Sequence, residues 1–334
     1  MEEKNITLVI DMMGGDQGLQ MTKDAVWAFH AKYPLAKLIL VGEAGTLNDM
    51  DAFEVVSSRG VMKMDAGALD VLRNKESSMA KALTICQERK ADGVISAGGT
   101  GAFLSAATLI LKKIPGVKRP ALITSFPNFK TKRNVTILDV GASNENTPEE
   151  IAQFAVMGSI YSSIIDKIDN PVVKLLANGT EENKGSPEGK EAFKLLRNDK
   201  NVNFQGNIEA SQVLASDTDV VVTDGYSGNI LLKSTEGAAK QIGSLIKAIF
   251  KKNWISKLSY LGVRKGIKGF KDTLDPRKVG GAMLIGVNGV VVKAHGNSDS
   301  EAFFHAIEVA YSLASKELVK KISDALEGSL DGEH

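Results

Sequence analysis

The sequence contains a single cysteine, Cys86, among its 334 residues. One cysteine excludes a disulfide framework and a cysteine-based zinc site, and it fits a protein of a reducing cytoplasm. No run of about 18 apolar residues is present, so we expect no membrane-spanning helix. The chain also lacks an excess of either charge, because 41 Lys and Arg residues stand against 40 Asp and Glu residues. This balance argues against a nucleic-acid-binding protein.

The motifs of several common enzyme classes are also absent. There is no G-x-x-x-x-G-K-[ST] sequence, which argues against a P-loop NTPase. The glycine pair Gly99 and Gly101 lacks the third glycine and the later acidic residue of a standard dinucleotide site. No G-x-S-x-G sequence exists, and Cys86 lies within an apolar helical pattern. We therefore expect no cofactor, no metal and no covalent nucleophile, but direct attack by a bound nucleophile.

Short apolar runs alternate with amphipathic helical patterns along the chain. This alternation predicts a three-layer α/β/α sandwich with a mostly parallel sheet and helices on both faces. Asn288-Gly289 is a hairpin signal that predicts some antiparallel strands, and Thr147-Pro148 is typical of a helix start. We expect one catalytic domain over residues 1–334, with a protruding helical arm at about 237–274. The expected strands are residues 6–10, 38–41, 93–96, 121–125, 135–138, 172–176, 220–223, 282–285 and 289–293.

Polar, glycine-bearing segments follow five of these strands, at residues 11–16, 96–101, 139–141, 178–185 and 224–229. Ligands of open α/β sheets bind beyond the carboxyl ends of the strands, and helix N-termini there favour anions such as phosphate. Any one segment alone is better explained as a tight turn. Five segments at one expected edge favour a ligand site. The residues expected to bind phosphate or substrate are Asp11, Gly14, Gly15, Ser96, Gly98, Thr100, Gly101, Ser227 and Lys233.

Few titratable side chains are placed for catalysis. Of four histidines, only His295 lies at the end of a predicted strand, and a structural role remains an alternative for it. Lys184 lies in a loop beside glycine and acidic residues, and Lys233 follows the 224–229 segment on a helix. Either lysine could pair with phosphate, although an ordinary surface role is the alternative for both.

One segment of the chain is strongly basic. Residues 251–278 contain nine basic and two acidic residues, a net charge of +7. Apolar residues recur at helical spacing on both sides of Gly262, which predicts two helices with a bend there. A basic amphipathic helix suits an anionic membrane surface or an acidic partner, and a helical dimer interface is the alternative. The expected contact residues are Trp254, Leu258, Leu261, Arg264, Lys265 and Lys268.

Several motifs occur together in one order. They are Asp11-Met-Met-Gly-Gly-Asp16, Ser96-Ala-Gly-Gly-Thr-Gly-Ala102, Gly179-Thr-Glu-Glu-Asn-Lys-Gly185, Asp224-Gly-Tyr-Ser-Gly-Asn229 and Lys293-Ala-His-Gly296. Together they resemble the bacterial acyl-ACP:phosphate acyltransferases, the PlsX family. The resemblance implies that inorganic phosphate attacks the thioester of a fatty acyl–acyl carrier protein, giving acyl-phosphate and free carrier. This reaction is an early step of phospholipid synthesis.

The resemblance carries further expectations about fold and partners. It implies a fold like those of phosphotransacetylases and isocitrate or isopropylmalate dehydrogenases, and a cytoplasmic homodimer attached peripherally to an anionic membrane. Acyl carrier protein and inorganic phosphate are the expected partners, with a glycerol-3-phosphate acyltransferase as the possible consumer of the product. The implied catalytic residues are Lys184, Asn229, His295, Asp16 and Asp224.

The chain departs from the family pattern at two positions. Gly99 and Ser143 both stand where the family usually has Asn. These departures are the support for one alternative function, a membrane-docked scaffold that binds acyl carrier without turnover. A phosphotransacylase that acts on acyl-coenzyme A is a second alternative, independent of them.

Overall fold

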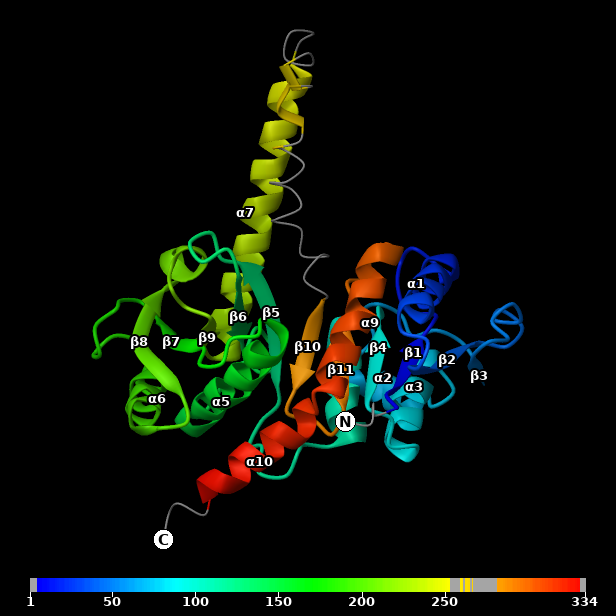
Figure 1. Cartoon of the computed structure of the whole chain (residues 1–334), viewed down its shortest axis with the longest axis horizontal. Helices are drawn as coiled ribbons and strands as arrows, with labels where there is room; N and C mark the ends of the chain where they lie inside the picture. The colour runs from blue at the N-terminus through cyan, green and yellow to red at the C-terminus, as the bar shows by residue number, and fades with distance from the viewer. Residues whose placement is uncertain (1–4, 253–258, 261, 265, 267–280, 331–334) are drawn as a thin grey trace.

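The computed structural model describes residues 5–252, 259–260, 262–264, 266 and 281–330 (Figure 1). The described strands form one sheet of eleven strands, in the order β3-β2-β1-β4-β11-β10-β5-β6-β9-β7-β8. In chain order they are β1 (Thr7–Asp11), β2 (Lys37–Glu43), β3 (Glu54–Ser58), β4 (Gly93–Ser96), β5 (Ala121–Pro127), β6 (Asn134–Leu138), β7 (Val172–Ala177), β8 (Asn203–Glu209), β9 (Val220–Val222), β10 (Ala282–Ile285) and β11 (Val290–Lys293).

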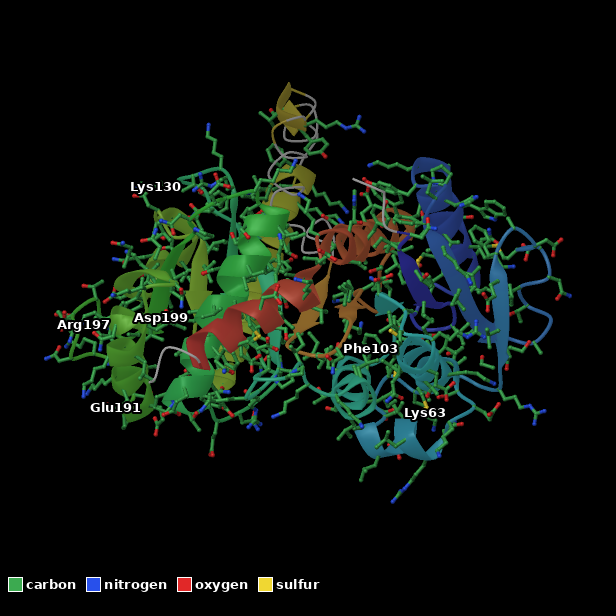
Figure 2. All side chains as sticks on the ribbon, turned by 60° about the horizontal axis from the view of Figure 1, so that its bottom comes forward. Lys63, Phe103, Lys130, Glu191, Arg197 and Asp199 are labelled. Atoms are coloured by element: carbon green, nitrogen blue, oxygen red, sulfur yellow. The ribbon has the colours of Figure 1, made fainter. Side chains whose placement is uncertain are left out.

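Helices cover both faces of this sheet, so the predicted mostly parallel α/β fold is confirmed. They are α1 (Leu19–Lys32), α2 (Ala68–Arg73), α3 (Ser78–Glu88), α4 (Thr100–Leu111), α5 (Pro148–Ile165), α6 (Pro187–Asn198), the 3₁₀ helix η1 (Ala210–Ala215), α7 (Gly225–Lys251), α9 (Ser300–Ser315) and α10 (Leu318–Leu330). Apolar residues of α1, α5, α6, α9 and α10 form one core, and those of α2, α3, α4 and α7 pack with the other. Phe103 of α4 is completely buried, whereas Lys130, Glu191 and Arg197 reach solvent (Figure 2).

The predicted helix start at Thr147 is confirmed. The Thr147 hydroxyl accepts a hydrogen bond from Glu150 N, and the Glu150 carboxylate accepts one from Thr147 N, which together form a capping box before α5. Pro148 occupies the first helical position, where its missing N–H group costs no hydrogen bond.

The sheet consists of two parallel blocks that run in opposite directions. β3, β2, β1, β4 and β11 are parallel to one another, and so are β6, β9, β7 and β8. Three antiparallel pairs, β11–β10, β10–β5 and β5–β6, connect the blocks, including the predicted hairpin at Asn288-Gly289. The prediction that all five glycine-bearing segments share one edge is therefore wrong. Residues 11–16 and 96–101 lie at one edge, and the other three segments lie at the opposite edge.

Helix α7 extends beyond the body of the molecule (Figure 1). Its outer part exposes an apolar row at helical spacing: Ile242 is 47% exposed, Leu245 64% and Ile249 62%. The rings of Phe250 and Tyr260 lie 5.5 Å apart. Gly262, the predicted bend, has helical conformation. Trp254, Leu258, Leu261, Lys265 and Lys268 lie outside the described residues, whereas Arg264 is described and exposed.

None of the described helices is both long enough and apolar enough to cross a bilayer.

Candidate active site

A cleft of about 620 Å³ opens on the sheet face that carries α4 and α7. These two helices begin at opposite edges of the sheet, because they follow β4 and β9, and both line the cleft. Its floor is the centre of the sheet, where β5 and β10 lie side by side (Figure 1). The floor residues are Leu122, Thr124, Ala282 and Leu284, and the wall residues include Leu104, Ser105, Thr108, Leu232, Lys233 and Glu236.

The two ends of the cleft carry different polar groups. The end that we call the histidine end contains Asp16, Thr100, Gly101, Lys293 and His295. The other, which we call the asparagine end, contains Val140, Gly141, Ala142 and Asn229.

At the histidine end, two buried residues, Asp11 at the end of β1 and Ser96 at the end of β4, are hydrogen-bonded to each other. The Ser96 hydroxyl donates to Asp11 Oδ2 at 2.6 Å and accepts a hydrogen bond from Gly98 N at 3.0 Å. Burial raises the pKa of Asp11, and the hydrogen bond from Ser96 opposes this rise. A Cβ atom at Gly14 would lie 2.6 Å from Gly98 N, so the two loops touch only because Gly14 lacks a side chain. These predicted binding residues hold the loops together.

Helix α4 presents its N-terminus to the histidine end. Its N-cap, Gly99, provides no side-chain hydrogen bond, and its first residues, Thr100 and Gly101, line the cleft. The first N–H groups of a helix lack partners within the helix and attract anions. This end therefore has the backbone features of an anion site, as predicted for Thr100 and Gly101.

Three side chains from two elements meet beside this helix N-terminus. Asn297 N donates to His295 Nδ1 at 3.2 Å, so in the neutral ring the proton resides on Nε2. Glu236 and Lys233 of α7 line the same cleft. Desolvation raises the pKa of Glu236, and the charges of His295 and Lys233 oppose this rise. The sequence interpretation did not include Glu236; its spacing of three from Lys233 on the same helix could have found it.

Lys293 is a second residue that the sequence interpretation left out. It is the last residue of β11, is only 4% exposed and lines the cleft. Its ammonium donates to the carbonyl oxygens of Ala97, at 3.4 Å, and Ala294. Desolvation lowers the pKa of Lys293 to about 8, although the charges of Asp16 and Asp11 oppose this. A charged residue ending an apolar strand, two residues before His295, was the available sequence signal.

The asparagine end is built around a buried carboxylate, Asp139. It accepts hydrogen bonds from the backbone N–H groups of Leu122, Gly141, Ala142 and Ser143 and from the Ser143 hydroxyl. The first turn of α7 packs directly on this loop, since a Cβ atom at Gly228 would lie 1.9 Å from the Asp139 carbonyl oxygen. That packing places Asn229 beside Gly141 at the cleft.

Eight predicted site residues are not among the described residues that line this cleft. Five of them, Asp11, Gly14, Gly15, Ser96 and Gly98, lie at the ends of β1 and β4 or in the loops that follow, and the other three are Asp224, Ser227 and Lys184. Asp224 is the N-cap of α7, and its Oδ1 accepts a hydrogen bond from Ser227 N at 2.8 Å. Lys184 lies in the loop after β7 and packs over Gly179, where a Cβ atom would be 2.7 Å from Lys184 Cγ. Asp224, Ser227 and Lys184 all follow strands of the block whose carboxyl ends face away from the histidine end.

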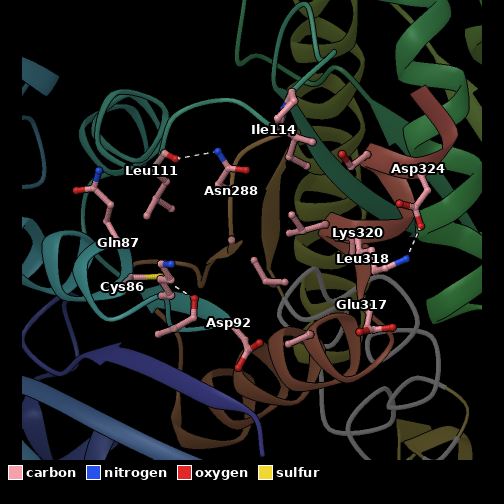
Figure 3. A pocket seen from close by; sticks show the side chains of 18 residues that line it. Cys86, Gln87, Asp92, Leu111, Ile114, Asn288, Glu317, Leu318, Lys320 and Asp324 are labelled. Carbon is pink, nitrogen blue, oxygen red and sulfur yellow. Dashed lines mark hydrogen bonds and ion pairs between the residues drawn. The ribbon is translucent and has the colours of Figure 1, made fainter. Parts of the chain in front are cut away.

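A second cavity, of about 560 Å³, lies at the other end of β11 (Figure 3). Cys86 and Leu111 line one side and Leu318 and Asp324 the other, with Asn288 between them. Desolvation raises the pKa of the Cys86 thiol to about 12, so the thiol stays protonated at neutral pH and is no nucleophile. In the described part of the chain, no group of three or more His, Cys, Asp or Glu side chains could hold a metal ion.

The sequence matches the family described as "Fatty acid synthesis protein" over residues 6–321. The phosphate acyltransferase of Neisseria meningitidis serogroup C is 39% identical, and the match covers 96% of this chain and 94% of that protein. The phosphate acyltransferase of Fervidobacterium nodosum is 41% identical, covering 96% and 98%. The chain belongs to this family. The resemblance inferred from the motifs, and the acyltransferase enzyme class, are thereby confirmed.

Solved structures confirm the expected phosphotransacetylase-like fold. The phosphotransacetylase of Streptococcus pyogenes superposes with a TM-score of 0.62 at 18% identity, covering 94% of this chain and 95% of that one. A branched-chain phosphotransacylase from Enterococcus faecalis gives 0.60 at 14% identity, covering 92% and 99%. At these identities the likeness concerns the fold alone.

The two departures from the family motifs have structural explanations. A Cβ atom at Gly99 would lie 2.5 Å from the Met64 carbonyl oxygen, because the chain around Met64 occupies the space of a side chain. The Ser143 hydroxyl lies 2.7 Å from Asp139 Oδ2 and 3.0 Å from Asn146 Oδ1. Gly99 therefore fits against Met64 because it has no side chain. Ser143 adds a hydrogen bond to the buried carboxylate of Asp139.

Proposed function

We propose that the chain transfers a fatty acyl group from acyl carrier protein to inorganic phosphate. A phosphate oxygen attacks the thioester carbonyl carbon and the C–S bond breaks. Acyl-phosphate forms, and the carrier thiolate takes up a proton. The observation that carries this proposal is the cleft, which joins an anion-binding helix N-terminus to an apolar floor. The family membership of the chain supports the same reaction.

Residues of the cleft fit the separate requirements of this reaction. N–H groups at Thr100 and Gly101 would bind phosphate or the thioester oxyanion, an interaction typically worth about 3–4 kcal/mol of activation barrier. His295 would donate a hydrogen bond from Nε2–H to the leaving sulfur, and Asp16 would accept the phosphate proton, which then passes to the carrier thiolate. Asn229 would donate a hydrogen bond from the asparagine end. Lys184, Asp224 and Ser227 would have to act from outside the cleft as it stands, which makes them weaker candidates.

The outer part of α7 supports two further parts of the proposal. The exposed row Ile242, Leu245 and Ile249 suits a second copy of this chain, which would bury it in a homodimer. The basic segment beyond it, with Arg264, suits an anionic membrane surface and the docking of an acidic carrier protein. The acyl-phosphate formed there would then reach a glycerol-3-phosphate acyltransferase for phospholipid synthesis.

The decisive experiment follows the carrier thiol. Purified protein is incubated with palmitoyl–acyl carrier protein and increasing phosphate, without lipid, and free thiol and acyl-phosphate are both measured. Thiol release that saturates with phosphate, matched by acyl-phosphate, is expected. Carrier binding without release would favour a scaffold. Equal or faster turnover with palmitoyl-coenzyme A would favour the phosphotransacylase alternative.

A further inference from the structure

The reaction needs a cation beside the attacking phosphate, and the sequence predicted Lys184 or Lys233 for this role. In the structure, Lys184 lies outside the cleft, whereas Lys293 lines its histidine end. Lys293 is paired in register with Ser96 at the end of β4, and Ala294 N donates to Ser96 O at 3.0 Å. The lysine is thereby fixed next to the loop that leads into α4.

The hydrogen bonds of Lys293 leave capacity for a ligand. An ammonium group has three N–H donors, and the described residues supply two acceptors, the carbonyl oxygens of Ala97 and Ala294. Both acceptors are neutral, and the described ion pairs include no carboxylate within 4.0 Å of Lys293. A buried charge without a close counter-ion is costly, so an anion that enters this end of the cleft gains both a donor and a counter-charge.

Other charged groups nearby define the electrostatic setting. Asp11 and Asp16 approach from the β1 side, His295 follows β11, and Lys233 and Glu236 reach the cleft from α7. Helix α4 contributes no charged side chain. Burial raises the pKa of Asp11, and desolvation raises that of Glu236.

We propose that Lys293 is the residue that binds the attacking phosphate, through the ammonium N–H that Ala97 and Ala294 leave free. This inference rests on the proposed function and gives it a specific cation. The same ammonium connects the loop before α4 to the end of β11. Phosphate, Thr100 and His295 are thus held in one fixed arrangement.

The test compares Lys293→Met and Lys293→Arg with two matched lysine variants. Lys320→Met, on an exposed lysine of α10 paired with Asp324, serves as the control, and Lys184→Met provides the direct competitor. Lys293→Met is expected to raise the KM for phosphate at least tenfold with little change in the KM for acyl carrier. It should also abolish the rise in melting temperature that phosphate gives the wild type. A phosphate KM within twofold of wild type in a folded Lys293→Met protein overturns the proposal.

A second measurement leaves the lysine unchanged, in case Lys293→Met does not fold. Because the pKa of Lys293 is lowered to about 8, phosphate affinity of the wild type should fall as the pH rises above about 8. Lys293→Arg should move that fall to higher pH, because guanidinium stays protonated. A wild-type affinity that is flat from pH 7 to 9.5 contradicts the proposal. Wild-type protein that binds phosphate without thiol release instead refutes the proposed function and leaves the binding assignment standing.

Discussion

The two ends of the cleft both contain a buried charged group, but they satisfy it differently. Asp139, at the asparagine end, accepts hydrogen bonds from five donors of its own loop and strand neighbours. Lys293, at the histidine end, has two neutral acceptors. A saturated group holds the fold in place and offers nothing to a ligand. A group with unused hydrogen-bonding capacity is suited to binding, so the comparison assigns a scaffolding role to Asp139 and a binding role to Lys293.

The largest expected effect on stability comes from a substitution at the asparagine end. Gly228→Ala places a Cβ atom 1.9 Å from the Asp139 carbonyl oxygen, and neither backbone can move without releasing the first turn of α7. We expect a loss of about 3 kcal/mol or more in the free energy of unfolding, measured by urea titration. Gly237→Ala is the matched control on the same helix, because its Cβ atom would meet nothing within 4 Å. Gly237→Ala should stabilise the protein by up to about 1 kcal/mol; equal effects of the two variants would contradict this packing.

Removal of one donor from Asp139 is expected to have a smaller effect. Ser143→Ala deletes the hydroxyl that lies 2.7 Å from Asp139 Oδ2, while the four backbone donors remain. We expect a loss of about 2 kcal/mol, the usual range for a buried hydrogen bond to a charged group. Phosphate KM should stay near the wild-type value if the Asp139–Ser143 pair only supports the fold. A large increase in that KM would show that the asparagine end takes part in binding.

Much of the fold was predictable because buried strands leave a simple pattern. β1, β4 and β11 are nearly or completely buried, and their apolar runs predicted them. β3 and β8 lie at the two edges of the sheet and are only partly buried, so their mixed sequences gave no strand signal. The glycine-bearing segments were found, but not their division between two edges. That division depends on three antiparallel pairs, of which the sequence signalled only the hairpin at Asn288-Gly289.

The candidate site was also predictable only in part. Thr100, His295 and Asn229 were chosen because they follow strands, and the structure brings them to one cleft. Lys184 was preferred because glycine and acidic residues flank it in a loop, whereas Lys293 was not considered as a site residue, although it ends an apolar strand. Burial, which gives Lys293 its unusual environment, arises from β4 and β10 on either side and is not visible in the local sequence.

A substitution beside the histidine end should have a still smaller effect on stability. Gly99→Ala brings a Cβ atom within 2.5 Å of the Met64 carbonyl oxygen, but Met64 lies in a turn between β3 and α2, where no helix or strand hydrogen bonds hold the backbone in place. We expect a loss of about 1 kcal/mol, at the low end of overpacking costs. Gly101→Ala, whose Cβ atom would meet nothing within 4 Å, is the control and should not destabilise the protein. Thermal unfolding of both variants measures the difference, and a neutral Gly99→Ala would show that the Met64 loop does not hold its position.

The smallest expected effect concerns the pH dependence of stability at the histidine end. Burial raises the pKa of Asp11 above its ordinary value of 3.8, so the folded protein keeps the proton at pH values where the unfolded chain has lost it. The stabilisation from this group is complete below pH 3.8 and is lost as the pH rises toward the raised pKa of the folded state. Asp11→Asn removes the titration. Between pH 4 and 7, its free energy of unfolding should therefore fall less than that of the wild type, whatever the absolute stability of the variant. Parallel urea titrations at several pH values measure both slopes. Identical slopes would mean that Asp11 is ionised in the folded protein and that its hydrogen bonds satisfy it, as those of Asp139 do at the asparagine end.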